Sequence, residues 1–161
     1  MRLDYSCVSN NPHGNEDMTT ETFDPSAFEE ALIDDLRANG GSPSQGPLAG
    51  HPLLLMFSTG AKSGERRRSI LTYWRDGEDY IVAGTAGGSK VDPAWVANVT
   101  KDPNVELEVA NETFPATATV YRDGPDRDRL WSQHVEHLPW FADYAAQVGG
   151  RIIPMIRLRR A

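Results

Sequence analysis

Three short apolar runs between Pro52 and Gly84, each bounded by turn-forming residues, constrain the fold of this chain more than any other feature. They cover residues 52–57, 69–74 and 80–84. Apolar runs of this length between turn signals are typical of β-strands. The pair Asp76-Gly77 separates the second run from the third, and such a pair favours a tight hairpin between neighbouring strands. The sequence therefore predicts antiparallel strand pairing.

Three later segments extend the predicted sheet. Residues 105–109 alternate strictly between apolar and acidic side chains, and residues 114–120 alternate again. Strict alternation predicts strands that are buried on one face. Pro115 lies in the second of these segments and indicates an edge or a bulge, because proline donates no hydrogen bond to a sheet. The apolar run within 151–158 predicts a closing strand.

Helices are predicted between and around these strands. Asp24-Pro25 is a favourable helix start, and the apolar spacing after it predicts an amphipathic helix that ends at Asn39-Gly40. Shorter helices are expected over 93–101, 124–138 and 140–147. The strand-helix-strand alternation of a parallel sheet is missing. The pattern therefore favours a small closed antiparallel barrel with helices outside it.

Composition and charge exclude several classes of protein. The formal net charge of −7 argues against a general nucleic-acid binder, and the single cysteine, Cys7, excludes an internal disulfide framework. No apolar run approaches the roughly 18 residues of a membrane span, and no apolar signal region is present at the start. Residues 1–22 are polar and lack periodicity, so we expect a disordered extension before a single domain over 23–161. A soluble, cytoplasmic protein is expected.

A glycine-containing turn at residues 59–64 leads into three consecutive arginines. Its order differs from a phosphate-binding loop because Ala61 precedes Lys62. Glycines still allow backbone N–H groups to approach an anion, and Lys62 adds a positive charge. Neighbouring side chains of a strand point to opposite faces, so Arg67 should face away from Arg66 and Arg68. Taken alone, the pattern favours a solvated hairpin tip over an anion site.

Two further features bear on ligand binding. The loop Thr85–Ser89 lies between a predicted strand and a helix that carries Trp95. Its paired glycines permit close approach of a ligand, but a plain connection is an equally good interpretation. His134 and His137 share a helix face without an evident third ligand, so no metal site is expected. No nucleophile and base can be paired, which favours chemistry supplied by a cofactor.

The order and spacing of three segments resemble the deazaflavin-dependent nitroreductase family, whose members bind coenzyme F420. The segments are Leu53–Leu55 with Thr59–Arg67, then Gly84–Gly88, then Asp92–Asn98, and the resemblance extends from about Phe28 to Leu158. It implies a mainly β fold with α-helices: a six- to seven-stranded antiparallel split β-barrel with flanking helices. This barrel is the FMN-binding split-barrel type of flavin reductases and pyridoxamine-phosphate oxidases.

The resemblance also implies a set of cofactor-binding residues. Lys62, Ser63 and Arg67 match positions that hold the phosphodiester and oligoglutamate tail of coenzyme F420. The positions that line the deazaflavin ring are matched by Ser69, Ile70, Ala83, Thr85, Ala86, Gly87, Gly88, Ala94 and Trp95. The strand alternation that isolates Arg67 from its two neighbours agrees with a single arginine ligand.

The resemblance further implies an F420H2-dependent oxidoreductase that transfers a hydride to a small electron-poor acceptor, such as a quinone, an enone or a nitro compound. Nitroreductase members place tyrosines near the C-terminus, where this chain has Leu138 and Phe141 and keeps only Tyr144. Tyr144 is the candidate proton donor or substrate contact; a packed aromatic side chain is the alternative. The partners expected are the cofactor and this substrate, with a homodimer left open.

Two other functions fit the same barrel. An FMN-dependent reductase would need fewer basic contacts, because FMN carries a single phosphate. A non-catalytic protein that binds a deazaflavin or an apolar ligand would need no proton donor, in keeping with the reduced tyrosine set.

Overall fold

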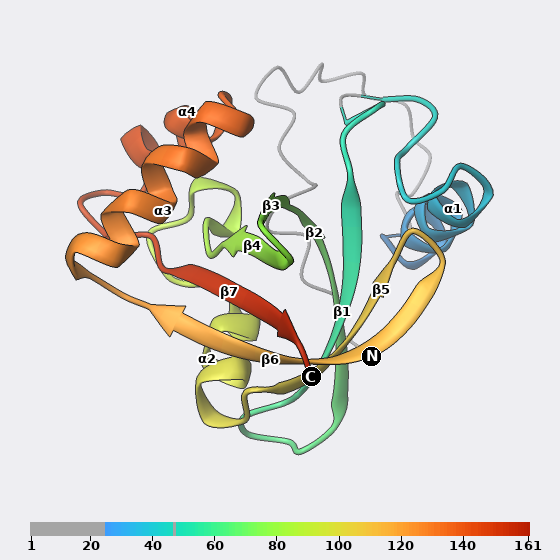
Figure 1. Ribbon diagram of the computed structural model, residues 1–161, viewed down its shortest axis with the longest axis horizontal. Coiled ribbons are helices and arrows are strands. Elements are labelled where there is room, and N and C mark those ends of the chain that lie inside the picture. Colours follow the sequence, from blue (N-terminus) through green and yellow to red (C-terminus); the bar gives the residue numbers. More distant parts are fainter. Residues whose placement is uncertain (1–24, 47) are drawn as a thin grey trace.

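The computed structural model describes residues 25–46 and 48–161 (Figure 1). The predicted disorder of residues 1–22 and the predicted helix start at Asp24 lie outside these residues. The helices are α1 (Pro25–Ala38), α2 (Ala94–Lys101), α3 (Gly124–His137) and α4 (Phe141–Gln147), with a short 3₁₀ turn η1 (Ala86–Gly88). The strands are β1 (Leu53–Thr59), β2 (Arg66–Thr72), β3 (Trp74–Asp76), β4 (Asp79–Ala83), β5 (Asn104–Val109), β6 (Glu112–Tyr121) and β7 (Met155–Arg160).

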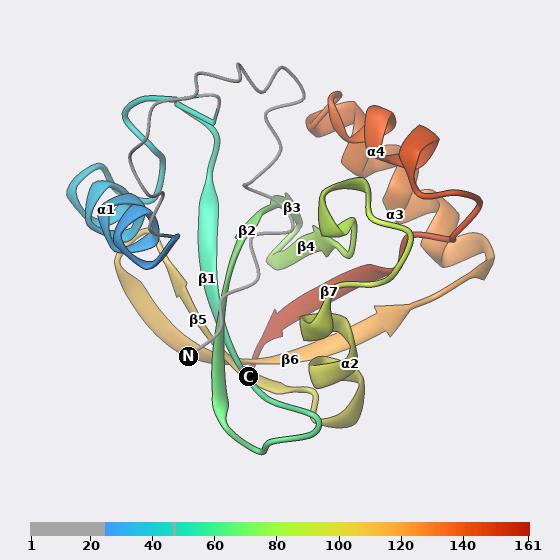
Figure 2. The ribbon, with the colours of Figure 1, turned by 180° about the vertical axis from the view of Figure 1, so that it is seen from behind.

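The seven described strands form one antiparallel sheet in the order β2-β1-β5-β6-β7-β4-β3. The sheet curves into a half-barrel, with α1 beside the β1–β2 end and α3 and α4 beside the β3–β4 end, both on the face that points away from α2 (Figures 1 and 2). The prediction of a six- to seven-stranded antiparallel split barrel with flanking helices is confirmed. The closed barrel suggested by the strand pattern alone is wrong, because β2 and β3 end the sheet order without pairing to each other.

The strand boundaries correct one local prediction and define the position of Pro115. The run 69–74 was expected to be one strand, but Tyr73 divides it between β2 and β3. This break lets β2 pair with β1 while β3 pairs with β4 at the opposite end of the sheet. Pro115 lies in a strand with two neighbours, yet β7 pairs with β6 only from Ala116 onward. Just beyond this pairing the N–H of Ala161 donates to the carbonyl of Pro115 at 3.0 Å, and Pro115 has no N–H to return the bond, so the β6–β7 ladder ends at this proline.

Alternation along β1 distributes side chains to two apolar clusters. Leu54 and Met56 point into the main core, where they meet Trp95 of α2. Leu53 and Leu55 point the other way and pack against α1. Both faces of this strand are buried, which explains why its sequence is apolar without interruption. Helix α2 therefore covers the inner face of the sheet, and α1 covers the outer face beside β1 and β2.

A third cluster, beneath α3 and α4, contains a fully buried histidine. The indole nitrogen Nε1 of Trp74 donates a hydrogen bond of 3.0 Å to Nδ1 of His134. Nε2 of His134 has no partner among the described residues. Burial, and then the charge of His137, lowers the pKa of His134 from 6.5 to about 3. The imidazole is therefore neutral at ordinary pH.

This histidine makes the fold sensitive to acid. Between pH 6.5 and about 3, His134 is protonated in the unfolded chain but stays neutral in the native protein. The free energy of unfolding therefore falls as the pH is lowered through this window. We expect His134→Gln, which offers an acceptor to Trp74 but does not titrate, to lose stability less steeply between pH 6.5 and 4. Urea unfolding at a series of pH values measures this slope. An equal slope in both proteins would show that His134 is not the group responsible for the acid sensitivity.

Candidate functional site

The turn between β1 and β2 is built around Gly60. Its N–H donates to the carbonyl of Glu65 at 2.7 Å, and its own carbonyl accepts from the N–H of Gly64 at 2.9 Å. A Cβ atom at Gly60 would lie only 2.5 Å from Oγ of Ser63. Gly64 has a φ of 70°, in the left-handed region that glycine adopts freely. The two glycines thus allow a tight turn that presents Lys62 and Ser63 to solvent.

Helix α2 fixes the position of this turn. The buried side chain of Asn98 accepts a hydrogen bond from the N–H of Ala61 at 2.9 Å. Nζ of Lys101 donates to the carbonyl of the same residue at 2.7 Å. Asn98 and Lys101 are three residues apart, so they lie on one face of the helix. The sequence analysis assigned no role to either residue. Their spacing of three on the predicted helix could have indicated that both polar side chains face one neighbouring segment.

A pocket of about 660 Å³ lies between the turn, β2 and the first turns of α2. This volume is within the usual range for small-molecule sites, roughly 300–1,000 Å³. Its lining residues are Gly60, Ala61, Lys62, Ser63, Arg67, Arg68, Ser69, Pro93, Ala94, Trp95, Ala97 and Asn98. Ala94 and Ala97 are exposed on the helix and have no bulky side chain, so they leave the space above α2 open.

The three arginines of β2 divide between its two faces, as strand alternation predicts. Arg67 lies on the pocket side and donates to Oγ of Ser63 at 3.2 Å. Arg66 lies over the ring of Phe57 and pairs with Glu106. Arg68 borders the pocket, but its guanidinium pairs with Glu30 of α1 at 2.8 Å. Only Arg67 directs its charge to the turn.

The mouth of the pocket carries a positive charge that is largely uncompensated. Lys62 is exposed and makes no ion pair within the described part of the chain. Arg67 pairs with Glu65 at 3.4 Å, but the Glu65 side chain is 70% exposed. Such exposed pairs are weak, so an incoming anion can replace Glu65 at little cost. The arrangement suits an anionic group at the turn with a flatter, less polar group over α2.

Six of the predicted cofactor-binding residues meet at this pocket: Lys62, Ser63, Arg67, Ser69, Ala94 and Trp95. Trp95 is 1% exposed, so it forms the floor of the pocket and also part of the core. Ser69 is buried on the same face of β2 as Arg67. These residues come from two separate segments of the sequence, 62–69 and 94–95, and the fold brings them to one place.

The other predicted ring-lining residues do not line this pocket. Ile70 points to the opposite face of β2 and packs in the cluster under α1. Ala83 and Thr85 are buried at the end of β4 and just beyond it. Ala86, Gly87 and Gly88 form η1, which packs against α4; a Cβ atom at Gly88 would lie 2.5 Å from Oε1 of Gln147.

Tyr144, the candidate proton donor, lies on α4 and is 7% exposed. Its ring packs edge-on against Phe141 at 5.2 Å. Because α4 contacts η1, the helix that carries Tyr144 adjoins the glycine loop. Tyr144 does not line the pocket at the β1–β2 turn.

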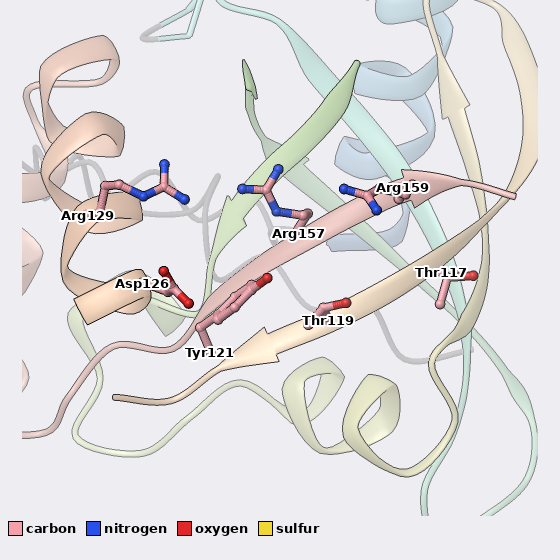
Figure 3. A pocket seen from close by; sticks show the side chains of 7 residues that line it. All are labelled: Thr117, Thr119, Tyr121, Asp126, Arg129, Arg157 and Arg159. Atoms are coloured by element: carbon pink, nitrogen blue, oxygen red, sulfur yellow. The ribbon is translucent and has the colours of Figure 1, made fainter. Parts of the chain in front are cut away.

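A second pocket, of about 510 Å³, lies over β6 and β7 beside α3 (Figure 3). Three arginines line it, and Figure 3 shows Arg129 of α3 pointing toward Arg157 of β7. Arg157 pairs with Asp76 at 2.8 Å and with Asp79 at 2.6 Å, and Arg159 pairs with the same Asp79 at 3.0 Å. Carboxylates thus neutralise its cations, which makes it a poorer anion site than the first pocket.

The described residues show neither a metal-binding cluster nor a membrane-spanning helix. No group of three or more His, Cys, Asp or Glu side chains is placed there to hold a metal ion. None of the helices in this part of the chain has both the length and the apolar character needed to cross a membrane.

Most of the chain is similar to a known protein family. Residues 32–159 match the model of a family described as F420H(2)-dependent quinone reductase. A Mycobacterium tuberculosis protein named as an F420H(2)-dependent quinone reductase is 35% identical over 111 residues, which are 68% of this chain and 74% of that protein. The match includes both segments that form the pocket.

Two solved structures are also similar. One is described as an F420-H2 dependent reductase (FDR-A); it has 30% identity and a TM-score of 0.60, over 67% of this chain and 94% of that one. The other is described as a domain-swapped dimer; it has 26% identity and a TM-score of 0.62, over 84% of this chain and 100% of that one.

These matches refine the family resemblance. The nitroreductase name was imprecise, because the matching family is described by quinone reduction. They also favour the deazaflavin over FMN as the cofactor of the barrel. The chain therefore belongs to the F420H(2)-dependent quinone reductase family, and is an oxidoreductase with coenzyme F420 as its cofactor.

Proposed function

We propose that this protein reduces a quinone, using reduced coenzyme F420 held in the pocket between the β1–β2 turn, β2 and α2. The observation that supports this most is the charge of Lys62, which forms no ion pair with any described residue, beside Arg67 at the mouth of that pocket. A pocket with a basic mouth and a Trp floor fits a flat ring with an anionic tail. The acidic net charge of the chain does not oppose this, because a local cluster sets the potential at a site.

The residues at the turn would hold the cofactor tail. The guanidinium of Arg67 presents paired N–H groups that match a phosphate or a carboxylate, and Lys62 adds a point charge. Ser63 now accepts a hydrogen bond from Arg67, so both side chains already face one another across the site. Asn98 and Lys101 hydrogen-bond to the backbone of the turn and fix its shape before the cofactor binds. Binding of the tail therefore does not have to order the turn.

The residues deeper in the site would hold the ring. Ser69, Ala94 and Trp95 line the pocket, and Trp95, whose side chain is almost completely buried in the core, fixes the apolar floor beneath the ring. We propose that the backbone of Ile70 and the loop of Ala83, Thr85, Ala86, Gly87 and Gly88 complete the wall. When bound, the reduced cofactor supplies a hydride to the acceptor. The contribution of the chain is to fix the ring, exclude water from one side and leave the other side open.

Enones and nitro compounds are the alternative hydride acceptors. Both are electron-poor in the same way as a quinone, but the absence of tyrosines at 138 and 141 favours the quinone.

The neighbour described as a domain-swapped dimer supports a homodimer for this chain as well. Size-exclusion chromatography with light scattering can measure the oligomeric state.

The tail site is tested by removing its two cations. We expect Lys62→Ala with Arg67→Ala to weaken F420 binding by about 100-fold or more, because hydrogen bonds to charged groups contribute roughly 1.5–3 kcal/mol each. Cofactor fluorescence during titration measures the affinity. Arg66→Ala is the matched control, since Arg66 lies on the other face of β2 and should leave binding unchanged. Normal binding by the double variant would show that the pocket is assigned wrongly.

The role of Tyr144 is tested by removing its hydroxyl. If it donates the proton that accompanies hydride transfer, Tyr144→Phe should lower kcat for a soluble naphthoquinone by about 100-fold while F420 affinity stays the same. Tyr80→Phe is the control, because Tyr80 is also 7% exposed but lies in the main core. An unchanged kcat in Tyr144→Phe would leave this tyrosine as a packing residue only.

A further inference from the structure

Arg151, which lies between α4 and β7, makes an unusually complete set of hydrogen bonds to one loop. Its Nε and Nη2 both donate to the carbonyl of Ser89, at 3.2 and 2.9 Å. Nη2 also donates to the carbonyl of Thr85, and Nη1 to that of Gly84, each at 2.9 Å. Nη1 further donates to Oδ1 of Asp92 at 2.5 Å. These bonds use all five N–H groups of the guanidinium.

The loop that Arg151 holds needs such support. Ala86, Gly87 and Gly88 have φ values of 49°, 63° and 86°, and a left-handed conformation is uncommon for alanine. Residues in such conformations persist when surrounding contacts fix them. The side chain of Arg151 is only 12% exposed, and its bonds to Gly84, Thr85 and Asp92 are partly buried, so these bonds are stronger than those of a surface arginine.

The same bonds connect Arg151 to the pocket. Asp92, its ion-pair partner, directly precedes Pro93, Ala94 and Trp95, which line the pocket at the start of α2. Arg122 pairs with the second oxygen of Asp92 at 3.0 Å, but its side chain is 51% exposed. Arg151 is therefore the buried link between the glycine loop and the first turn of α2, although it does not line the pocket itself.

We propose that Arg151 is a positioning residue for the cofactor site: it holds the loop 84–92 in the shape that presents both the glycine loop and the floor of the pocket. This inference rests on the proposed function. If Arg151 has this role, then the planar shape of its guanidinium, and not only its charge, is required to hold the loop 84–92. A lysine keeps one positive charge for Asp92 but has three donors on a single nitrogen, so it cannot reach three carbonyls and a carboxylate together.

The test uses Arg151→Lys and Arg151→Met, with Arg157→Lys as the control. Arg157 is a fair match because its side chain is 14% exposed and pairs with Asp76 and Asp79, but it contacts neither the loop nor the pocket. Hydrogen exchange of the cofactor-free proteins is measured first. We expect amides of 84–92 to exchange at least about tenfold faster in both Arg151 variants, and not in Arg157→Lys.

F420 titration then measures the consequence for the site. We expect both Arg151 variants to bind F420 about tenfold more weakly than wild type, because binding must now order the loop. Arg157→Lys should lower the melting temperature without changing this affinity. Wild-type exchange and affinity in Arg151→Lys would overturn the inference, since charge alone would then suffice. Faster exchange with unchanged affinity would also overturn it, because the loop would not shape the site.

Failure of the proposed function gives a different result. In that case wild type itself does not bind F420, whatever the variants do. A normal wild-type titration with unaffected Arg151 variants would reject only the positioning role.

Discussion

The packing of α2 against the inner face of the sheet is the contact on which the rest of the site depends. Trp95, Val96 and Val99 are almost completely buried there, which fixes the helix in the core. From this fixed position Asn98 and Lys101 hold the β1–β2 turn. The segment before α2 is held by Arg151 through Asp92. One short helix therefore joins both glycine-containing loops to the core, and a loss of its packing would disturb both.

The distribution of charge explains how an acidic protein can bind an anion. The chain has a formal net charge of −7, yet its arginines are mostly paired: Arg157 and Arg159 with Asp79, and Arg68 with Glu30. These pairs neutralise the second pocket and the outer face of β2. Lys62 stands apart from them, beside a loosely paired Arg67. The position of the uncompensated charge, and not the total charge, therefore identifies the anion site.

Much of the fold followed from local patterns, because alternation records which strand faces are buried. The strands at 105–109 and 114–120 were predicted from it, as was the separation of Arg67 from Arg66 and Arg68. The break at Tyr73 was not predicted, and the open barrel was predicted only from the family resemblance, since both depend on which distant strands pair. Ile70 shows the limit of carrying residues over from a resemblance: its side chain faces α1 while Ser69 faces the pocket. Arg151 had no sequence signal, because its partner Ser89 lies 62 residues away.

The most direct test of the account is a titration of the wild-type protein with coenzyme F420 of increasing glutamate number and, separately, with FMN, followed by ligand fluorescence. The account predicts that F420 binds more tightly than FMN, that each added glutamate raises the affinity until the tail extends beyond the basic turn, and that salt reduces this gain. An affinity that ignores the glutamates, or a preference for FMN, would contradict the assignment of Lys62 and Arg67 to the cofactor tail.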